Sequence, residues 1–103
     1  MSIAHFNRTA AEQITSRLIE LGITHCCISP GSRSTPLTDA LSRSAMTQHL
    51  FFDERAAAFF ALGVGKASRR PALMVTTSGT AVSNLLPAVT EADAADIPLL
   101  IIT

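Results

Sequence analysis

The feature that most constrains the fold of this chain is a recurring order of segments. A short apolar run ends at a polar or glycine-containing turn, and a helical pattern follows; the runs cover residues 23–29, 49–53 and 72–77, and a fourth covers 98–103. Runs that are apolar at nearly every position are typical of strands buried on both faces, and helical connections make such strands parallel. The order therefore predicts an α/β fold, a doubly wound parallel sheet with helices on both faces.

The start of the first helix is predicted from a local motif. The segment from Thr9 to Glu12 resembles a capping box, and Gly22 is a typical stop signal. The apolar face of this helix is predicted from three residues at helical spacing: Ile14, Leu18 and Leu21.

Prolines set the expected limits of two later helices. The second helix is expected over about residues 35–44, with Thr35 as its cap and Pro36 in its first turn. A fourth helix is expected over residues 81–92, and Pro87 should kink it because proline lacks the backbone donor.

Composition limits the classes of function. The chain has 103 residues, of which 48% are hydrophobic, and this suffices for one domain with a packed core. Eight basic residues balance eight acidic ones, so binding of nucleic acid is not expected. There is neither a signal-peptide pattern nor an apolar run of the roughly 18 residues that a membrane span needs. We therefore expect a cytoplasmic protein.

The potential metal ligands are not arranged as a metal site. Cys26 and Cys27 are adjacent on an apparent strand, so their side chains should point to opposite faces and remain reduced thiols of the core. His5, His25 and His49 are scattered, which favours strand or surface roles over metal binding.

The last strand has no loop after it. The sequence stops within residues 98–103, whereas ligands of open parallel sheets bind beyond the carboxyl ends of the strands. We therefore expect the chain to be a truncated part of a longer enzyme.

Three polar loops should meet at one edge of the sheet. They follow the first three strands and cover residues 29–35, 53–54 and 77–80. Each loop opens a helix, whose free N–H groups suit an anionic or polar ligand. A ligand-binding edge is predicted there, although the third loop alone, with its single glycine, is no more than a turn with a cap.

Arg33 is the candidate anion ligand of the first loop. Its charge lies next to a helix N-terminus and opposes the helix dipole, a conflict that a bound anion would resolve. The alternatives are that it points into solvent or pairs with a carboxylate of its own chain. For Ser32, Ser34 and Thr35, roles as turn and cap residues are favoured over ligand binding.

Glu54 is the best candidate for a chemical role. An acid in the first turn of a helix is stabilised by the dipole and needs no further explanation. However, an apolar setting would favour the neutral form of this carboxyl and allow proton exchange near neutral pH. Asp53 is expected to cap the helix or anchor the loop. Four phenylalanines could provide the apolar setting: Phe51, Phe52, Phe59 and Phe60.

Taken together, the loops resemble those of a known enzyme family, the 2-succinyl-5-enolpyruvyl-6-hydroxy-3-cyclohexene-1-carboxylate synthases. These are the thiamine diphosphate enzymes of menaquinone biosynthesis, and the resemblance covers essentially the whole chain. It rests on three segments in this order: Cys27-Ile28-Ser29-Pro30-Gly31-Ser32-Arg33-Ser34-Thr35-Pro36-Leu37, Phe52-Asp53-Glu54-Arg55 and Thr77-Ser78-Gly79-Thr80-Ala81-Val82.

The resemblance implies a role for each loop. Residues 1–103 would be the N-terminal part of the pyrimidine-binding domain, and Glu54 would be the catalytic glutamate that hydrogen-bonds N1′ of the cofactor. Ser32 and Arg33 would lie at the isochorismate pocket. The cofactor's pyrimidine end would be lined by the third loop: Thr77, Ser78, Gly79 and Thr80. The implied reaction decarboxylates 2-oxoglutarate and adds the resulting carbanion to isochorismate.

The resemblance also implies what this chain lacks. The diphosphate and its Mg²⁺ (or Mn²⁺) are bound in this family by a later domain, so the chain alone should be inactive. The full-length enzyme is expected to be a homo-oligomer, a dimer or tetramer, for which Phe59 and Phe60 are candidate contacts. Two alternatives remain: another thiamine diphosphate enzyme of the acetolactate synthase type, which should lack the Pro30–Pro36 loop sequence, or a non-catalytic α/β interaction module.

Overall fold

A parallel sheet lies at the centre of the molecule, which is described for residues 2–103 by a computed structural model. The sheet has four strands in the order β2-β1-β3-β4. The strands are β1 (His25–Ile28), β2 (Thr47–Leu50), β3 (Ala72–Val75) and β4 (Leu99–Ile102), and every neighbouring pair is parallel. The predicted doubly wound parallel sheet is confirmed.

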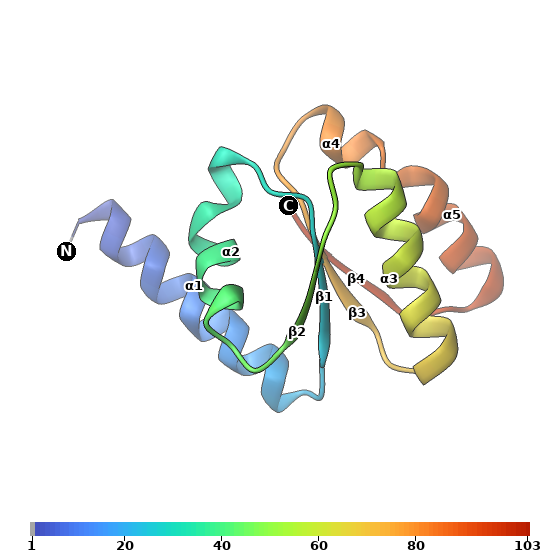
Figure 1. Ribbon diagram of the computed structural model, residues 1–103, viewed down its shortest axis with the longest axis horizontal. Coiled ribbons are helices and arrows are strands. Elements are labelled where there is room, and N and C mark those ends of the chain that lie inside the picture. The colour runs from blue at the N-terminus through green and yellow to red at the C-terminus, as the bar shows by residue number, and fades with distance from the viewer. Residues whose placement is uncertain (1) are drawn as a thin grey trace.

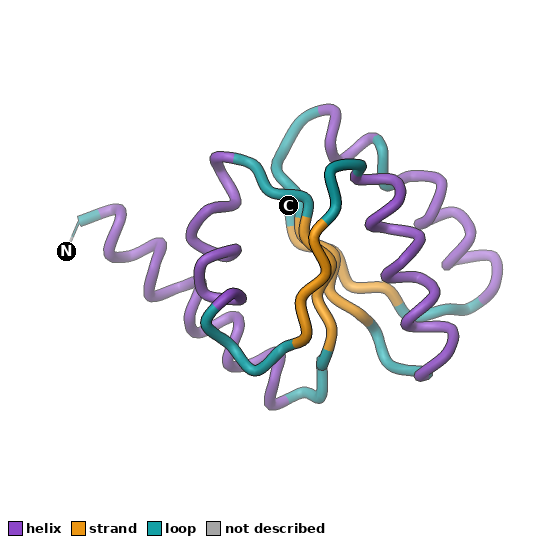
Figure 2. The backbone as a smooth tube through the Cα atoms, in the orientation of Figure 1, coloured by secondary structure: helices purple, strands orange, loops and turns teal. Residues whose placement is uncertain are grey.

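Helices cover both faces of this sheet (Figures 1 and 2). One face carries α1 (Ile3–Glu20) and α2 (Thr35–Ser42), and a short 3₁₀ turn, η1 (Ser32–Ser34), precedes α2. The other face carries α3 (Glu54–Ser68), the single-turn α4 (Thr80–Ser83) and α5 (Leu86–Ala95). Strand β2 thus lies on one side of β1 in the sheet, and β3 and β4 lie on the other side.

Strand alternation divides the core into two layers. Cys27 and Met74 pack under α3 and α5, whereas Cys26 and Leu73 pack under α1 and α2. Both cysteines are free, as expected, and burial raises the pKa of Cys26 to about 11 and that of Cys27 to about 12. Both thiols therefore stay protonated at neutral pH.

The first helix begins earlier than the capping-box motif predicted. Ser2 is its N-cap, with the Ser2 hydroxyl accepting from the backbone N–H of His5 at 3.1 Å, so Thr9 and Glu12 lie within the helix. The predicted apolar face was also wrong in part. Ile14 and Leu21 are exposed, and the buried face is made by small side chains that let the helix approach α2: Ala11 and Thr15, with the half-buried Leu18.

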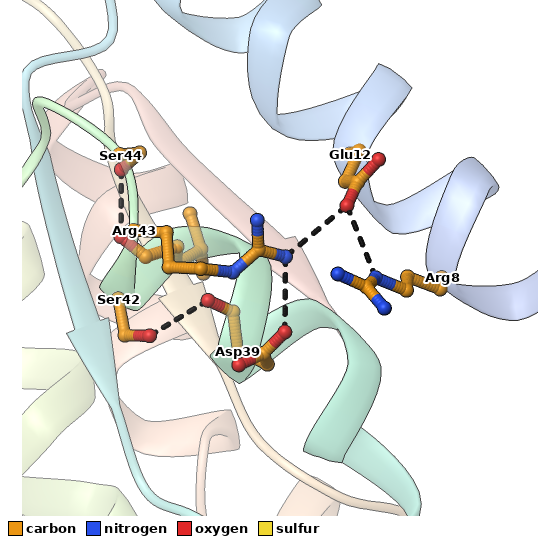
Figure 3. Close-up of polar contacts among 7 residues, drawn as sticks. Arg8, Glu12, Asp39, Ser42, Arg43 and Ser44 are labelled. Carbon is orange, nitrogen blue, oxygen red and sulfur yellow. Dashed lines mark hydrogen bonds and ion pairs between the residues drawn. The ribbon is translucent and has the colours of Figure 1, made fainter.

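An exposed ion-pair cluster joins α1 to the end of α2 (Figure 3). The guanidinium of Arg43 donates to Glu12 of α1 at 3.2 Å and to Asp39 of α2 at 3.0 Å, while Arg8 pairs with the same Glu12 carboxylate. These two carboxylates raise the pKa of Arg43 above its ordinary value. Because all the partners are exposed, the cluster orients α2 more than it stabilises the fold.

Three other boundaries differ from the sequence predictions. Helix α2 starts at Thr35 itself, with Ser34 as its N-cap, and Pro36 lies in the first turn as expected. The second strand is Thr47–Leu50 rather than 49–53, because Phe52 lies in the loop and is fully exposed. The expected kinked helix is two helices: the chain leaves α4 after Ser83 and restarts, with Pro87 in the first turn of α5.

Gly65 is the point of closest approach between α3 and the start of β4. A Cβ atom built on Gly65 would overlap the carbonyl oxygen of Pro98 and press on the side chain of Ile97. Two residues earlier on the same helix, Gly63 is exposed, and a Cβ atom there would meet nothing within 4 Å. Close packing therefore requires glycine at position 65, whereas no contact requires it at position 63.

The same substitution at these two positions should have opposite effects. We expect Gly65→Ala to lower the free energy of unfolding by about 1–3 kcal/mol, because the backbone of Pro98, just before β4, must move. Gly63→Ala should raise it by up to about 1 kcal/mol through helix propensity. Urea unfolding followed by circular dichroism measures both; equal effects of one sign would contradict the packing described for Gly65.

Candidate functional site

The loops that follow β1, β2 and β3 all leave the sheet at one edge, as the sequence predicted (Figure 1). The loop after β1 turns toward α2, whereas the loop after β3 turns toward α4 on the opposite face. Neighbouring parallel strands whose connections diverge in this way leave a crevice between them, where open α/β sheets bind their ligands. The site is therefore centred between the carboxyl ends of β1 and β3.

Two buried hydroxyl groups form the floor of this crevice. The register pairs Ile28 with Val75, so the next residues, Ser29 and Thr76, are neighbours across the two strands. Both are nearly inaccessible, at 3% and 1% exposure, and neither side-chain hydroxyl has a hydrogen-bond partner among the described residues. The pairing of these two residues was not predicted from the sequence, in which the available signal was a hydroxyl near the end of each apolar run.

The first and third loops touch directly above that floor. Gly31 lies against Thr77, so closely that a Cβ atom on Gly31 would come within 2.7 Å of the Thr77 Cβ. The turn is fixed by Ser34, whose hydroxyl donates to the carbonyl oxygen of Gly31 at 3.0 Å and accepts from its N–H at 3.2 Å. This confirms the interpretation of Ser34 as a turn residue.

Arg33 spans the mouth of the crevice. Its guanidinium donates to the Ser78 hydroxyl at 3.2 Å, and among the described residues it pairs with no carboxylate. The alternative of an ion pair within the chain is therefore wrong, and the charge of Arg33 remains available at the surface. A pocket of about 550 Å³ adjoins it, lined by residues that include Arg33, Thr76, Thr77 and Ser78.

Glu54 lies at the same edge, at the first position of α3. Asp53 caps the helix as predicted, with its carboxylate accepting from the N–H of Arg55 at 2.9 Å. The Glu54 side chain is half-buried, and among the described residues its carboxylate has no hydrogen-bond or ion-pair partner. Glu54 does not line the 550 Å³ pocket next to Arg33.

The expected apolar enclosure of Glu54 is not formed by this chain alone. Phe52 is fully exposed, and Phe59 and Phe60 are 41% and 42% exposed. Phe51 instead packs on the core and meets the ring of Phe60, with the ring centroids 5.3 Å apart. Local sequence proximity did not place these rings around the carboxyl.

The structure brings together only part of the predicted site. Arg33, Thr77 and Ser78 share one pocket, whereas Ser32 and Thr80 are exposed and do not line it. Gly79 adopts φ 79° and ψ −137°, a backbone conformation that favours glycine, and it leads into α4. The third loop thus owes its shape to this glycine rather than to a phosphate-binding pattern.

The metal-ligating side chains of residues 2–103 form no metal site, since no group of three or more His, Cys, Asp or Glu side chains in that range could hold a metal ion. His25 and His49, which are far apart in the sequence and were expected to be scattered, lie next to each other on β1 and β2. No helix within the described part of the chain is long and apolar enough to cross a membrane.

The fold and the three-loop edge agree with the family to which the sequence belongs. Residues 8–103 match the family described as thiamine pyrophosphate enzyme, N-terminal TPP binding domain. The chain belongs to this family of thiamine pyrophosphate enzymes.

Relatives with one printed name are similar over nearly the whole chain. The chain is 49% identical to the 2-succinyl-5-enolpyruvyl-6-hydroxy-3-cyclohexene-1-carboxylate synthase of Histophilus somni (strain 129Pt), over 100% of this chain and 19% of the relative. The enzymes of the same name from Shewanella frigidimarina (strain NCIMB 400) and Haemophilus influenzae (strain ATCC 51907 / DSM 11121 / KW20 / Rd) are 48% and 46% identical, over 97% and 100% of this chain and 17% and 19% of each relative. The resemblance inferred from the three loops is confirmed, and the chain spans about a fifth of the length of the curated relatives it matches.

The contact between the first and third loops should be measurable as an energetic coupling. We expect Gly31→Ala to destabilise the domain, because the new methyl group would overlap Thr77. Thr77→Gly in the same chain should recover part of that loss, giving a coupling of about 1 kcal/mol in a double-mutant cycle of urea unfolding. Strict additivity of the two changes would show that the loops do not press on each other.

Proposed function

We propose that this chain supplies the pyrimidine-binding part of a thiamine diphosphate-dependent synthase. The whole enzyme would decarboxylate 2-oxoglutarate and add the resulting carbanion to isochorismate, a step of menaquinone biosynthesis. The observation that carries the proposal is one edge of the sheet that holds both Glu54, at the start of α3, and Arg33, which has no carboxylate partner among residues 2–103. The family match and the printed names of the relatives support the same reaction.

The residues at the edge fit an aminopyrimidine with a polar rim. Glu54 is half-buried at a helix N-terminus, and its carboxylate has no partner within residues 2–103, so it can hydrogen-bond a ring nitrogen. The buried hydroxyls of Ser29 and Thr76, which have no hydrogen-bond partner among the described residues, support the proposal because such groups need a partner. The third loop, residues 77–80, would line the pyrimidine end.

The chemistry assigned to Glu54 is control of one proton. When bound, thiamine diphosphate supplies a nucleophilic carbon suited to attack on a 2-oxo acid. Glu54 would share a proton with N1′ of the pyrimidine through a hydrogen bond. In this way its carboxyl would determine which nitrogen atoms of the ring are protonated.

Arg33 and Ser32 are assigned to the anionic substrate. Both substrates carry carboxylates, and a guanidinium can bind a carboxylate through two parallel hydrogen bonds. Arg33 is held at the mouth of the crevice by Ser78, which leaves its remaining donors for a ligand. Ser32, exposed in the same 3₁₀ turn, would add a hydroxyl contact with isochorismate.

The diphosphate and its Mg²⁺ or Mn²⁺ are assigned to parts of the enzyme other than residues 2–103. No metal-ligating cluster occurs in that range. We further propose a homo-oligomer, a dimer or tetramer, whose partner subunit would complete the apolar setting of Glu54 and cover Phe59 and Phe60. A cytoplasmic location stays a prediction.

The role of Glu54 can be tested by removing its charge in the full-length enzyme. We expect Glu54→Gln to lower turnover of 2-oxoglutarate with isochorismate by at least about 100-fold, because the amide cannot hold the proton. Circular dichroism should be unchanged, and calorimetric titration should report how much binding of thiamine diphosphate itself is lost. Glu91→Gln, at an exposed glutamate of α5, is the matched control. Normal turnover of the Glu54 variant would remove this residue from the mechanism.

The role of Arg33 can be tested by a change in substrate dependence. We expect Arg33→Ala to raise KM for isochorismate by roughly 10- to 100-fold, as for loss of a charged hydrogen bond, with little effect on KM for 2-oxoglutarate. Arg17→Ala, at an exposed arginine of α1, is the control. An unaltered KM for isochorismate would refute this assignment.

A further inference from the structure

Two histidine rings meet across the edge of the sheet, on the face covered by α3. His25 of β1 and His49 of β2 are diagonal neighbours, since the register pairs His25 with Thr47 and Cys27 with His49. Nδ1 of His25 lies 3.1 Å from Nε2 of His49, and the rings are nearly parallel at 13° with centroids 5.3 Å apart. This is hydrogen-bond distance between two ring nitrogens.

Such a bond depends on the protonation state of both rings. A ring nitrogen donates only when it carries a hydrogen and accepts only when it does not, so at least one of the two facing nitrogens must be unprotonated. The bond exists when both rings are neutral and when the pair carries one extra proton. It cannot exist when both are imidazolium, because two donors and two positive charges then face each other.

The surroundings of the pair do not offset this repulsion. On the same face β1 contributes Cys27, whose thiol stays uncharged, and α3 contributes the ring of Phe60, with its centroid 4.6 Å from that of His49. The charged residues of α3 lie near its two ends: Glu54, Arg55 and Lys66. Burial and the neighbouring charge of His25 lower the pKa of His49 from its ordinary value of 6.5, and no carboxylate within residues 2–103 counteracts them.

The pair lies where it can affect Glu54. Within residues 2–103, β2 is an edge strand that pairs with β1 alone. It continues into Phe51, whose N–H donates to the carbonyl of Ile28 at 3.0 Å, and then into Asp53, which caps α3. Phe60, on the same helix as Glu54, contacts both His49 and Phe51. One cluster of rings thus joins β1, β2 and α3.

We propose that the His25–His49 pair is a proton-sensitive clasp, which holds β2 and the start of α3 against β1 and releases them when both rings are protonated. The direction follows from linkage. The folded state binds a proton at His49 less readily than the unfolded state, so the contribution of the clasp is present at and above neutral pH. It is lost as the pH falls below about 6.5.

The clasp can be tested by hydrogen exchange in the full-length protein that carries this domain. Peptides covering residues 47–54 are compared between about pH 7.5 and about pH 5, after correction for intrinsic exchange. We expect acid to accelerate their exchange at least about fivefold in the unmodified protein. His49→Gln and His25→Asn each keep a nitrogen near the original position but cannot be doubly protonated as a pair, and both should lose this acceleration.

The controls separate the clasp from a general effect of acid. His5→Gln, at an exposed histidine of α1, should behave as the unmodified protein does. If His49→Gln and His25→Asn retain the full acceleration, or the unmodified protein shows none, the proposal is wrong. Either variant decides the matter if its circular dichroism is native at neutral pH.

A measurement without substitutions gives an independent answer. Proton NMR of the histidine Cε1–H signals should show the two rings titrating in separate, coupled steps. Two rings that titrate independently at the ordinary value would overturn the proposal. Neither method needs cofactor or substrate, so the outcome does not depend on the enzymatic function proposed above.

Discussion

Backbone hydrogen bonds between β1 and β3 are the constraint on which the rest of this domain depends. Both strands are buried on both faces, and their register places Ile28 beside Val75. The same register brings the next residues together, so that Ser29 meets Thr76 and Gly31 meets Thr77. A slip by one residue would exchange the two core layers and separate the loops. The core and the candidate site therefore have one common determinant.

Features governed by local chemistry could be predicted from the sequence. Nearly continuous apolar runs indicated parallel strands, and Asp53 before Glu54 indicated a capped helix start. The edge shared by three loops also followed, because it is a general property of parallel sheets. The family resemblance came from the same loops, since residues that shape turns and bind ligands are the most distinctive part of such a sequence.

Features governed by distant contacts could not be predicted. Helix α1 begins at Ile3, where exposed residues give no apolar pattern and only the Ser2 cap marks the start. Phe52 is apolar but exposed, because β2 is an edge strand that ends two residues earlier. His25 and His49 are 24 residues apart, and only the pairing of β1 with β2 brings them together. For Phe52 and for the two histidines the decisive neighbours lie elsewhere in the chain, whereas the start of α1 is marked only by a local cap without an apolar pattern.

The two adjacent cysteines can report local opening of this domain, because they face opposite sides of the sheet. Cys26 faces the layer of α1 and α2, and Cys27 faces the layer of α3 and α5, yet both belong to one short strand. Neither thiol is accessible, and burial holds both in the unreactive protonated form. Alkylation of Cys26 therefore reports the lifting of one helical layer, and alkylation of Cys27 the lifting of the other. The chain carries two native reporters, one for each side of its sheet.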